Sequence, residues 1–205
     1  NLEAARENLA RIVGRDTANL NEAEVIRATV ETVAESLMDG VVAPLFYAAI
    51  GGAPFAITYK AINTLDSMVG NRSARYKKFG YFSAKIDEIA NWIPARISWF
   101  LIGVGAFFVN GRASESWQIG YKDGVVPSPA NSIVPEASFA GALGVELGGT
   151  NYYSGKAVET QKMGYPTRAL EKDDVRTAVQ LMQASSWAAL IFALFLHFLV
   201  SLVVH

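Results

Sequence analysis

Three carboxylates stand four residues apart at Glu31, Glu35 and Asp39. The stretch 22–38 has a helical pattern and Asn21 can cap it, so the three side chains share one helix face. Carboxylates at this spacing repel one another, so nothing within the helix favours the row. A bound cation would explain it, since Mg²⁺ prefers carboxylate, water and phosphate oxygens. We therefore predict a metal site here, with a solvated acidic face as the alternative.

A second polar group directly follows an uncharged run. In a helix over 59–70, Asn63 and Asp66 share a face, and Lys60 and Ser67 lie beside it. Polar side chains at the boundary of an apolar segment are costly unless they are paired. We expect this group to be functional. A structural pairing of Lys60 with Asp66 is the alternative.

A third group combines an acid, an amide and a guanidinium. Asp87 and Asn91 are four residues apart, and Arg96 lies on a neighbouring strip of the same helical pattern. Arginine can bind phosphate or carboxylate through two hydrogen bonds, so the three side chains predict a polar pocket. Anchoring at a membrane interface by Trp92 and Arg96 is equally favoured.

Basic and glycine-rich segments hold the remaining candidates. The segment 70–85 is rich in Lys and Arg and includes Arg72 and Arg75, so the positive-inside rule predicts that it is cytoplasmic. Ser128 and Asn131 lie in a Pro- and Ser-rich stretch where backbone amides can approach a ligand. The sequence contains neither a P-loop nor a clean G-x-G-x-x-G after a strand.

Three long apolar runs must position these groups. Residues 186–204 are nineteen uncharged residues, which at ~1.5 Å each nearly cross a ~30 Å hydrocarbon core, and we predict a C-terminal transmembrane helix there. The run 41–59 is interrupted by a Gly-Gly pair and Pro54, which predicts two short helices meeting at a bend. The run 93–109 is short for a full span. Together they predict an all-α, polytopic membrane protein with broken or re-entrant helices.

The composition agrees with a membrane protein. Apolar residues make up 51% and charged residues 18%, below the roughly 25% of soluble chains. A net charge of −1 excludes a nucleic-acid binder that relies on bulk charge. The chain has no cysteine, and its two histidines lie in the apolar tail. We expect one membrane-embedded helical domain over 1–205, in which 110–172 is a long Gly/Pro-rich loop with a short helix near 137–147.

Several strings occur in the order found in one family. They are Gly14-Arg-Asp-Thr17, Asp39-Gly-Val-Val-Ala-Pro-Leu-Phe46, Asn63-Thr-Leu-Asp-Ser-Met-Val-Gly70, Ala90-Asn-Trp-Ile-Pro-Ala-Arg96 and Ala140-Gly-Ala-Leu-Gly-Val145. The series closely resembles adenosylcobinamide-phosphate synthase, an integral membrane enzyme of cobalamin biosynthesis. The likeness runs from about Arg11 to about Gly155. Hydrophobic segments come first in that family, so with Asn1 in place of a Met we expect an internal start.

The resemblance implies an amide-forming reaction. Members join aminopropanol or its phosphate ester to a side-chain carboxylate of adenosylcobyric acid, driven by ATP with Mg²⁺. The corrinoid and the amine are then the small-molecule partners. The implied metal ligands are Glu31, Glu35 and Asp39, with Asp66 as an alternative. Asp66 or Asp87 would act as general base, and the sequence leaves that choice open.

The resemblance also implies the other roles and the location. Lys60 would act in catalysis or, with Arg72 and Arg75, bind phosphate or propionate groups. The orienting or substrate-binding residues are Asn63, Ser67, Asn91, Arg96, Ser128 and Asn131. We expect a multi-pass protein of the inner (cell) membrane, surrounded by lipid, with its site on the cytoplasmic side. The resemblance is also compatible with a homo-oligomer or with a complex that includes other membrane proteins of the pathway.

The sequence departs from the family pattern in two places. Ser36 stands where an Asn is usual, and Ser128-Pro-Ala-Asn-Ser132 replaces the usual Ser-Pro-Asn-Ala-Gly. A non-catalytic membrane sensor or assembly subunit on the same scaffold is therefore the alternative function. A transporter ranks last, because no repeated half is visible. A full span over 93–109 would separate Ser128 from the other groups, so we expect one of the two interrupted runs not to cross the membrane.

Overall fold

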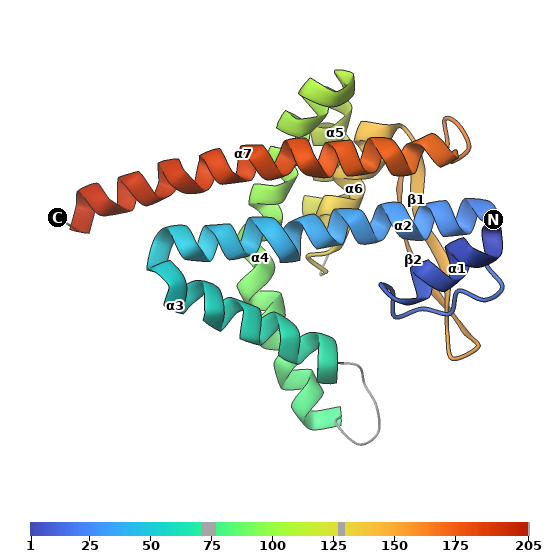
Figure 1. Ribbon diagram of the computed structural model, residues 1–205, viewed down its shortest axis with the longest axis horizontal. Helices are drawn as coiled ribbons and strands as arrows, with labels where there is room; N and C mark the ends of the chain where they lie inside the picture. Colours follow the sequence, from blue (N-terminus) through green and yellow to red (C-terminus); the bar gives the residue numbers. More distant parts are fainter. Residues whose placement is uncertain (71–76, 127–129, 205) are drawn as a thin grey trace.

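The computed structural model describes residues 1–70, 77–126 and 130–204 (Figure 1). Three predicted site residues, Arg72, Arg75 and Ser128, lie outside these described ranges. The helices are α1 (Leu2–Ala10), α2 (Glu22–Leu37), α3 (Ala43–Leu65), α4 (Lys77–Asn110), α5 (Ala113–Ile119), α6 (Ile133–Leu143) and α7 (Lys172–Val204). Three π-helical segments, η1 (Met38–Val42), η2 (Asp66–Gly70) and η3 (Gly120–Val125), and two strands, β1 (Glu146–Tyr153) and β2 (Lys156–Gly164), complete the fold.

Helix α2 and the helix after it form a hairpin. The Asn21 side chain accepts from the Glu24 backbone N–H, and the Glu24 carboxylate accepts from the Asn21 backbone N–H, so both hydrogen bonds of a capping box are present. The chain then continues through η1 into α3 and reverses at Gly52, whose φ of 66° and ψ of −160° are open essentially to glycine alone. The second half of α3 runs back below α2 (Figure 1). The predicted bend within 41–59 is confirmed.

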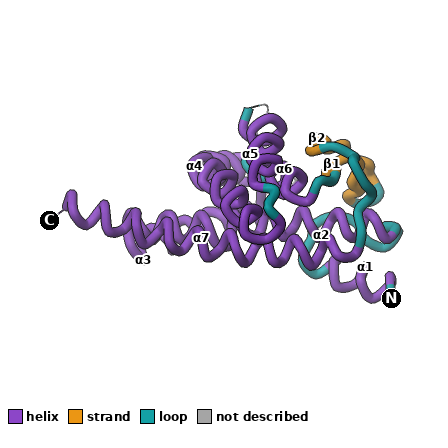
Figure 2. Tube along the Cα trace, turned by 90° about the horizontal axis from the view of Figure 1, so that it is seen from above, coloured by secondary structure: helices purple, strands orange, loops and turns teal. Residues whose placement is uncertain are grey.

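The core lies where four helices meet. Val30 of α2, Ile102 of α4, Phe139 of α6 and Leu181 of α7 are fully buried in one cluster. Helices α2 and α7 lie side by side in both views, and α4 crosses them (Figures 1 and 2). The short helix α6 is enclosed on all sides, so it acts as the centre around which the long helices pack.

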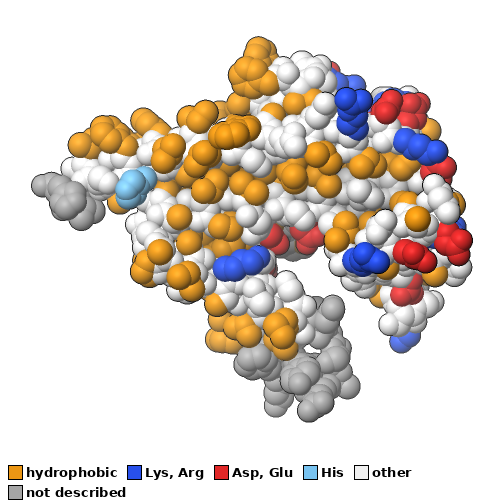
Figure 3. Space-filling model, viewed as in Figure 1, with side chains coloured by type: hydrophobic (Ala, Val, Ile, Leu, Met, Phe, Trp, Pro, Cys, Tyr) orange, Lys and Arg blue, Asp and Glu red, His pale blue; other side chains and the backbone are white. Residues whose placement is uncertain are grey.

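Within the described residues, three helical stretches are long and apolar enough to cross a membrane: Glu22–Val69, Gly80–Asn110 and Lys172–Val203. The last covers the predicted span 186–204 except for its final residue. Its C-terminal end extends beyond the other helices (Figure 2), and it exposes large apolar side chains such as Phe195 and Val203. Figure 3 shows hydrophobic side chains over this end of the molecule and charged side chains at the other end. The predicted helical membrane fold is confirmed.

The structure corrects the expectation of a long loop over 110–172. This segment forms α5, η3, α6 and an antiparallel hairpin of β1 with β2. Its glycines allow close packing: a Cβ at Gly141 would lie 2.4 Å from the carbonyl oxygen of Glu115, and one at Gly148 would lie 2.0 Å from that of Gln161. A composition that is typical of loops therefore encodes tight contacts here. The short helix expected near 137–147 is present as α6.

Candidate functional site

Members of each predicted polar group meet at one cavity of about 310 Å³ between α2, α3 and α4. It is lined by Glu35, Met38, Asp39, Asn63, Asp66, Ser67, Ala84, Asp87, Glu88, Asn91, Ala130, Asn131 and Ser132. In Figure 3 acidic side chains gather in the hollow between the arm of α3 and α4 and the rest of the molecule. We call this the acidic cavity.

Two π-helical turns hold acids of the cavity. Asp39 lies in η1, 13 residues before the bend at Gly52, and Asp66 begins η2, 14 residues after it. Because the hairpin folds back at that bend, the two acids approach one cavity although they are 27 residues apart in sequence. A π-turn inserts one extra residue into a helix and turns the following side chains to a new direction, and such turns are frequent at functional sites.

Two amide side chains orient two of these carboxylates. Lys60 Nζ donates to Asn63 Oδ1 (3.1 Å), and Asn63 Nδ2 donates to Asp39 Oδ2 (3.2 Å). Asn91 Nδ2 donates to Asp87 Oδ2 (2.9 Å). Each carboxylate is thus fixed through one oxygen only. Among the residues that the structure describes, the buried Oδ1 atoms of Asp39, Asp66 and Asp87 have no hydrogen-bond partner, so each is available to a ligand.

A contact from α4 holds the segment before α6 against the cavity. Arg96 Nη1 donates to Asn131 Oδ1 (3.0 Å), and Asn131 Nδ2 donates to the carbonyl oxygen of Glu88 (2.7 Å). The Arg96 guanidinium also lies over the Trp92 ring, 4.5 Å from its centroid. Arg96 thus stacks on an exposed Trp and also reaches a residue that lines the cavity. These contacts bring Asn131 to the α4 side of the acidic cavity.

Glu31 does not join Glu35 and Asp39 in the cavity. Its Oε2 pairs with Arg15 Nη2 at 2.6 Å, its Oε1 lies 3.6 Å from Arg27 Nη1, and the same Oε1 accepts the Gly148 N–H at 2.8 Å. All three charged side chains are nearly buried. Across the described residues, no group of three or more His, Asp or Glu side chains is arranged to hold a metal ion. The predicted three-carboxylate metal site is therefore not formed.

Sequence reasoning missed the partners of Glu31. Arg27 stands four residues before it, a spacing that signals an ion pair on one helix face. Arg15 belongs to the string Gly14-Arg-Asp-Thr17 and gives no local sign of its partner. It also donates to Asn151 Oδ1 of β1, so it joins the N-terminal loop, α2 and the hairpin.

A buried acid on α6 predicts a pH-dependent stability. Burial raises the pKa of Glu136 well above the ordinary value of a glutamate side chain, and the carboxylates of Glu31 and Glu35 raise it further. Arg15 and Arg27 oppose the shift. The folded state therefore binds the proton of the Glu136 carboxyl group more tightly than the unfolded state does. The protonated side chain contributes fully to the free energy of unfolding at low pH, and this contribution is lost as the pH rises.

Glu136→Gln should remove that loss. At about pH 8 we expect the variant to melt at a higher temperature than the parent, by roughly 2–4 °C for each kcal/mol gained in the free energy of unfolding. This difference in melting temperature should shrink towards about pH 5. Thermal unfolding in one detergent across that range tests this. A difference that stays constant with pH would contradict the role of the Glu136 proton.

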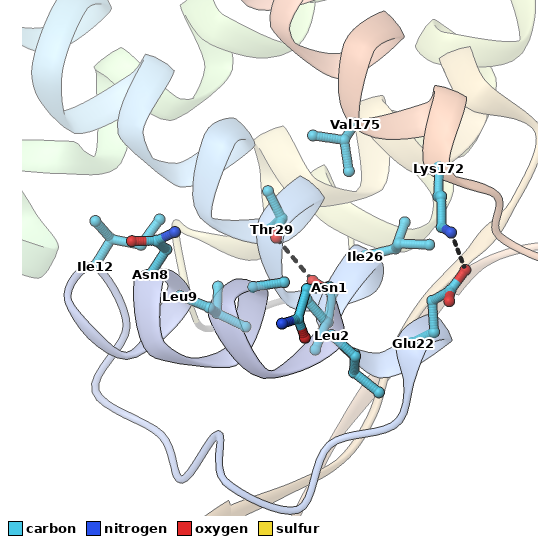
Figure 4. A pocket seen from close by; sticks show the side chains of 12 residues that line it. Asn1, Leu2, Asn8, Leu9, Ile12, Glu22, Ile26, Thr29, Lys172 and Val175 are labelled. Carbon is cyan, nitrogen blue, oxygen red and sulfur yellow. Dashed lines mark hydrogen bonds and ion pairs between the residues drawn. The ribbon is translucent and has the colours of Figure 1, made fainter.

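Another cavity, of about 370 Å³, offers no comparable chemistry. It lies between α1, α2 and α7 and is lined mainly by apolar side chains such as Leu2, Leu9 and Ile26 (Figure 4). Its two charged side chains, Glu22 and Lys172, pair with each other at 3.3 Å. Because its charges are already paired and its polar groups do not converge, we place the candidate site in the acidic cavity.

A sequence model of the CobD/Cbib protein family matches residues 1–182. The chain belongs to this family. The finding confirms the resemblance drawn from the motifs. The chain is 44% identical over 200 residues to the cobalamin biosynthesis protein CobD of Clostridium perfringens, and the match covers 98% of this chain and 64% of that protein. It is 46% identical over 194 residues to the protein of the same name from Yersinia enterocolitica, covering 94% and 61%.

The chain spans a little under two thirds of the length of these relatives. No solved structure gives a significant match. The name shared by the CobD relatives supports a role in cobalamin biosynthesis, and the three apolar helices are consistent with a membrane protein.

Proposed function

We propose that this chain carries the site of an amide-forming ligase in cobalamin biosynthesis. The reaction joins aminopropanol or its phosphate ester to a side-chain carboxylate of adenosylcobyric acid, with ATP as co-substrate. The observation that supports this most strongly is the acidic cavity, where three carboxylates each keep a buried, unpaired oxygen. Unpaired buried charge is costly, so it favours a ligand that satisfies these oxygens.

A protonated amine is complementary to such a cavity. The amine must lose a proton before it can attack an activated carboxylate, and a carboxylate within hydrogen-bond reach can accept it. We assign that role to Asp87. Asn91 holds its Oδ2, which leaves Oδ1 free for the proton, and Asp39 and Asp66 lie close enough to interact with it electrostatically. Asp66, whose Oδ1 is also free, is the second candidate.

The ATP phosphates are anionic and need a cation in an acidic site. Mg²⁺ commonly binds through one or two carboxylates together with phosphates and water, so two acids are enough. Glu35 and Asp39 would hold it, since both line the cavity and Glu35 is accessible to solvent. The ion would neutralise phosphate charge while the corrinoid carboxylate is activated. Lys60, which is exposed beside Asn63, and Arg96 would bind the anionic groups of the substrates.

The proposed location is the cytoplasmic face of the inner membrane. Lipid would surround the apolar half of α7 and the turn of the α2–α3 hairpin, whose exposed side chains include Phe55 and Ile57. We expect the large polar substrates to reach the acidic cavity from water. The corrinoid and the amine are the proposed partners, and assembly with a second copy or with other membrane proteins of the pathway remains compatible.

The departures from the family pattern do not disturb the cavity contacts. Ser36 is exposed and is absent from the cavity lining. Asn131, although displaced by one position, still bonds to Arg96 and to Glu88. These contacts favour the ligase over a non-catalytic sensor or assembly subunit.

The test uses the full-length protein in detergent or nanodiscs. It is incubated with adenosylcobyric acid, Mg-ATP and either aminopropanol or its phosphate, and the corrinoid is followed by mass spectrometry. We expect a mass gain equal to the amine minus water. Protein that binds the corrinoid yet forms no product with either amine would instead support the non-catalytic function.

A further inference from the structure

We propose that Tyr59 is a positioning residue for Asp87, acting through the side chain of Asn91; this rests on the proposed function. Tyr59 on α3 donates its hydroxyl proton to Asn91 Oδ1 at 2.9 Å, and Asn91 Nδ2 donates to Asp87 Oδ2 at 2.9 Å. Tyr59 and Asn91 are each 1% exposed. Tyr59 does not line the acidic cavity, so it acts behind the acid and not on substrate.

The hydroxyl of Tyr59 anchors the end of the Asn91 amide that points away from Asp87. The carboxylate of Asp87 can only accept, so it takes the NH₂ end of the amide, and the amide oxygen is left for the Tyr59 hydroxyl. Held at both ends, the amide has one position. If the Tyr59 hydroxyl is lost, the amide oxygen loses its partner and the Asn91 side chain can shift, so Asp87 is held less firmly. The carboxylate would move, and a misplaced proton acceptor slows the chemical step more than it weakens binding.

A second tyrosine holds the Tyr59 ring in place. The rings of Tyr47 and Tyr59 stack with centroids 5.1 Å apart and planes 14° apart. Tyr47 lies on the other arm of the hairpin, before the bend at Gly52, and its hydroxyl donates to the carbonyl oxygen of Ala90 at 2.8 Å. The stack therefore links both arms of the hairpin to α4. The two tyrosines differ in one respect: only the Tyr59 hydroxyl reaches a side chain that contacts a cavity acid.

A parallel arrangement serves Asp39, which supports reading the contact as a positioning device. There Lys60 donates to the oxygen of Asn63, and the Asn63 NH₂ group donates to the carboxylate. In both cases a donor on α3 fixes an amide, the amide holds one carboxylate oxygen, and the other oxygen stays free. Tyr59 and Lys60 are adjacent in sequence, so one turn of α3 supplies both donors.

The test compares Tyr59→Phe with Tyr47→Phe in the full-length protein. Each variant keeps its ring and loses one hydrogen-bonded hydroxyl. We expect Tyr59→Phe to lower kcat roughly 10-fold while the KM for each substrate changes less than about 2-fold. Tyr47→Phe should retain kcat within about 2-fold. Adding Tyr59→Phe to Asn91→Ala should cause no further loss, because the tyrosine acts through that amide.

Each other outcome decides against the proposal. Equal kcat losses in Tyr59→Phe and Tyr47→Phe, or a further loss in the double variant, would mean that Tyr59 only supports packing. A wild-type protein without ligase activity would overturn the proposed function together with this role. An active wild type with unchanged kinetics in Tyr59→Phe would overturn the positioning role alone.

Discussion

Asp87→Asn is expected to lower kcat by about 10²–10⁴-fold, the range that a positioned general base contributes. The substitution keeps the size of the side chain and its acceptor for the Asn91 NH₂ group, so the local fold should persist. It removes the negative charge and the free carboxylate oxygen that would accept the amine proton. The loss should therefore appear in kcat, and the affinity for the corrinoid should change little.

The matched control is Asp173→Asn, an exposed acid at the start of α7 and far from the cavity lining. It should keep full activity. Asp66→Asn separates the two candidate bases: if Asp87 accepts the proton, Asp66→Asn should show the smaller loss. An Asp87→Asn protein that is folded, binds the corrinoid and retains near-normal kcat would remove Asp87 from the mechanism.

The sequence alone predicted much of the acidic cavity, because its residues obey local rules. The four-residue spacing of Glu35 with Asp39 and of Asp87 with Asn91 placed each pair on one helix face. The glycines and proline at the centre of an apolar run indicated a bend. Such a bend returns the chain alongside itself, which is how Asn63 comes to contact Asp39.

Contacts between distant segments were beyond such rules. The spacing of the three acids predicts one site, yet Glu31 accepts hydrogen bonds from Arg15 and from the backbone N–H of Gly148, which lies 117 residues further along the chain. A helical period of about 3.6 residues cannot predict partners on other segments. The hairpin of β1 and β2 was missed for a related reason. Glycines such as Gly148 (φ 82°) were read as loop residues, whereas they allow close backbone contact within the sheet.

The contacts of Glu31 lead to a large expected effect on stability. Glu31→Gln keeps the shape of the side chain but leaves Arg15 and Arg27, whose side chains are 11% and 12% exposed, without their shared counter-charge. Breaking a buried ion pair from one side costs about 3–5 kcal/mol, because the remaining charge stays buried. For a chain of this size that corresponds to a fall in melting temperature of roughly 6–20 °C.

Glu22→Gln is the matched control on the same helix. Glu22 pairs with Lys172 at 3.3 Å, but both side chains are largely exposed, and such surface pairs contribute at most about 1 kcal/mol. Thermal unfolding of both variants in the same detergent should therefore separate them clearly. The comparison also distinguishes the two roles considered for Glu31. If Glu31 is structural, Glu31→Gln lowers the melting temperature and leaves the kcat of the remaining folded protein near normal. If Glu31 is a Mg²⁺ ligand, the substitution lowers kcat at an unchanged melting temperature, and high Mg²⁺ partly restores kcat. The ion pairs and the Gly148 N–H contact already occupy both Glu31 oxygens, so we expect the first outcome.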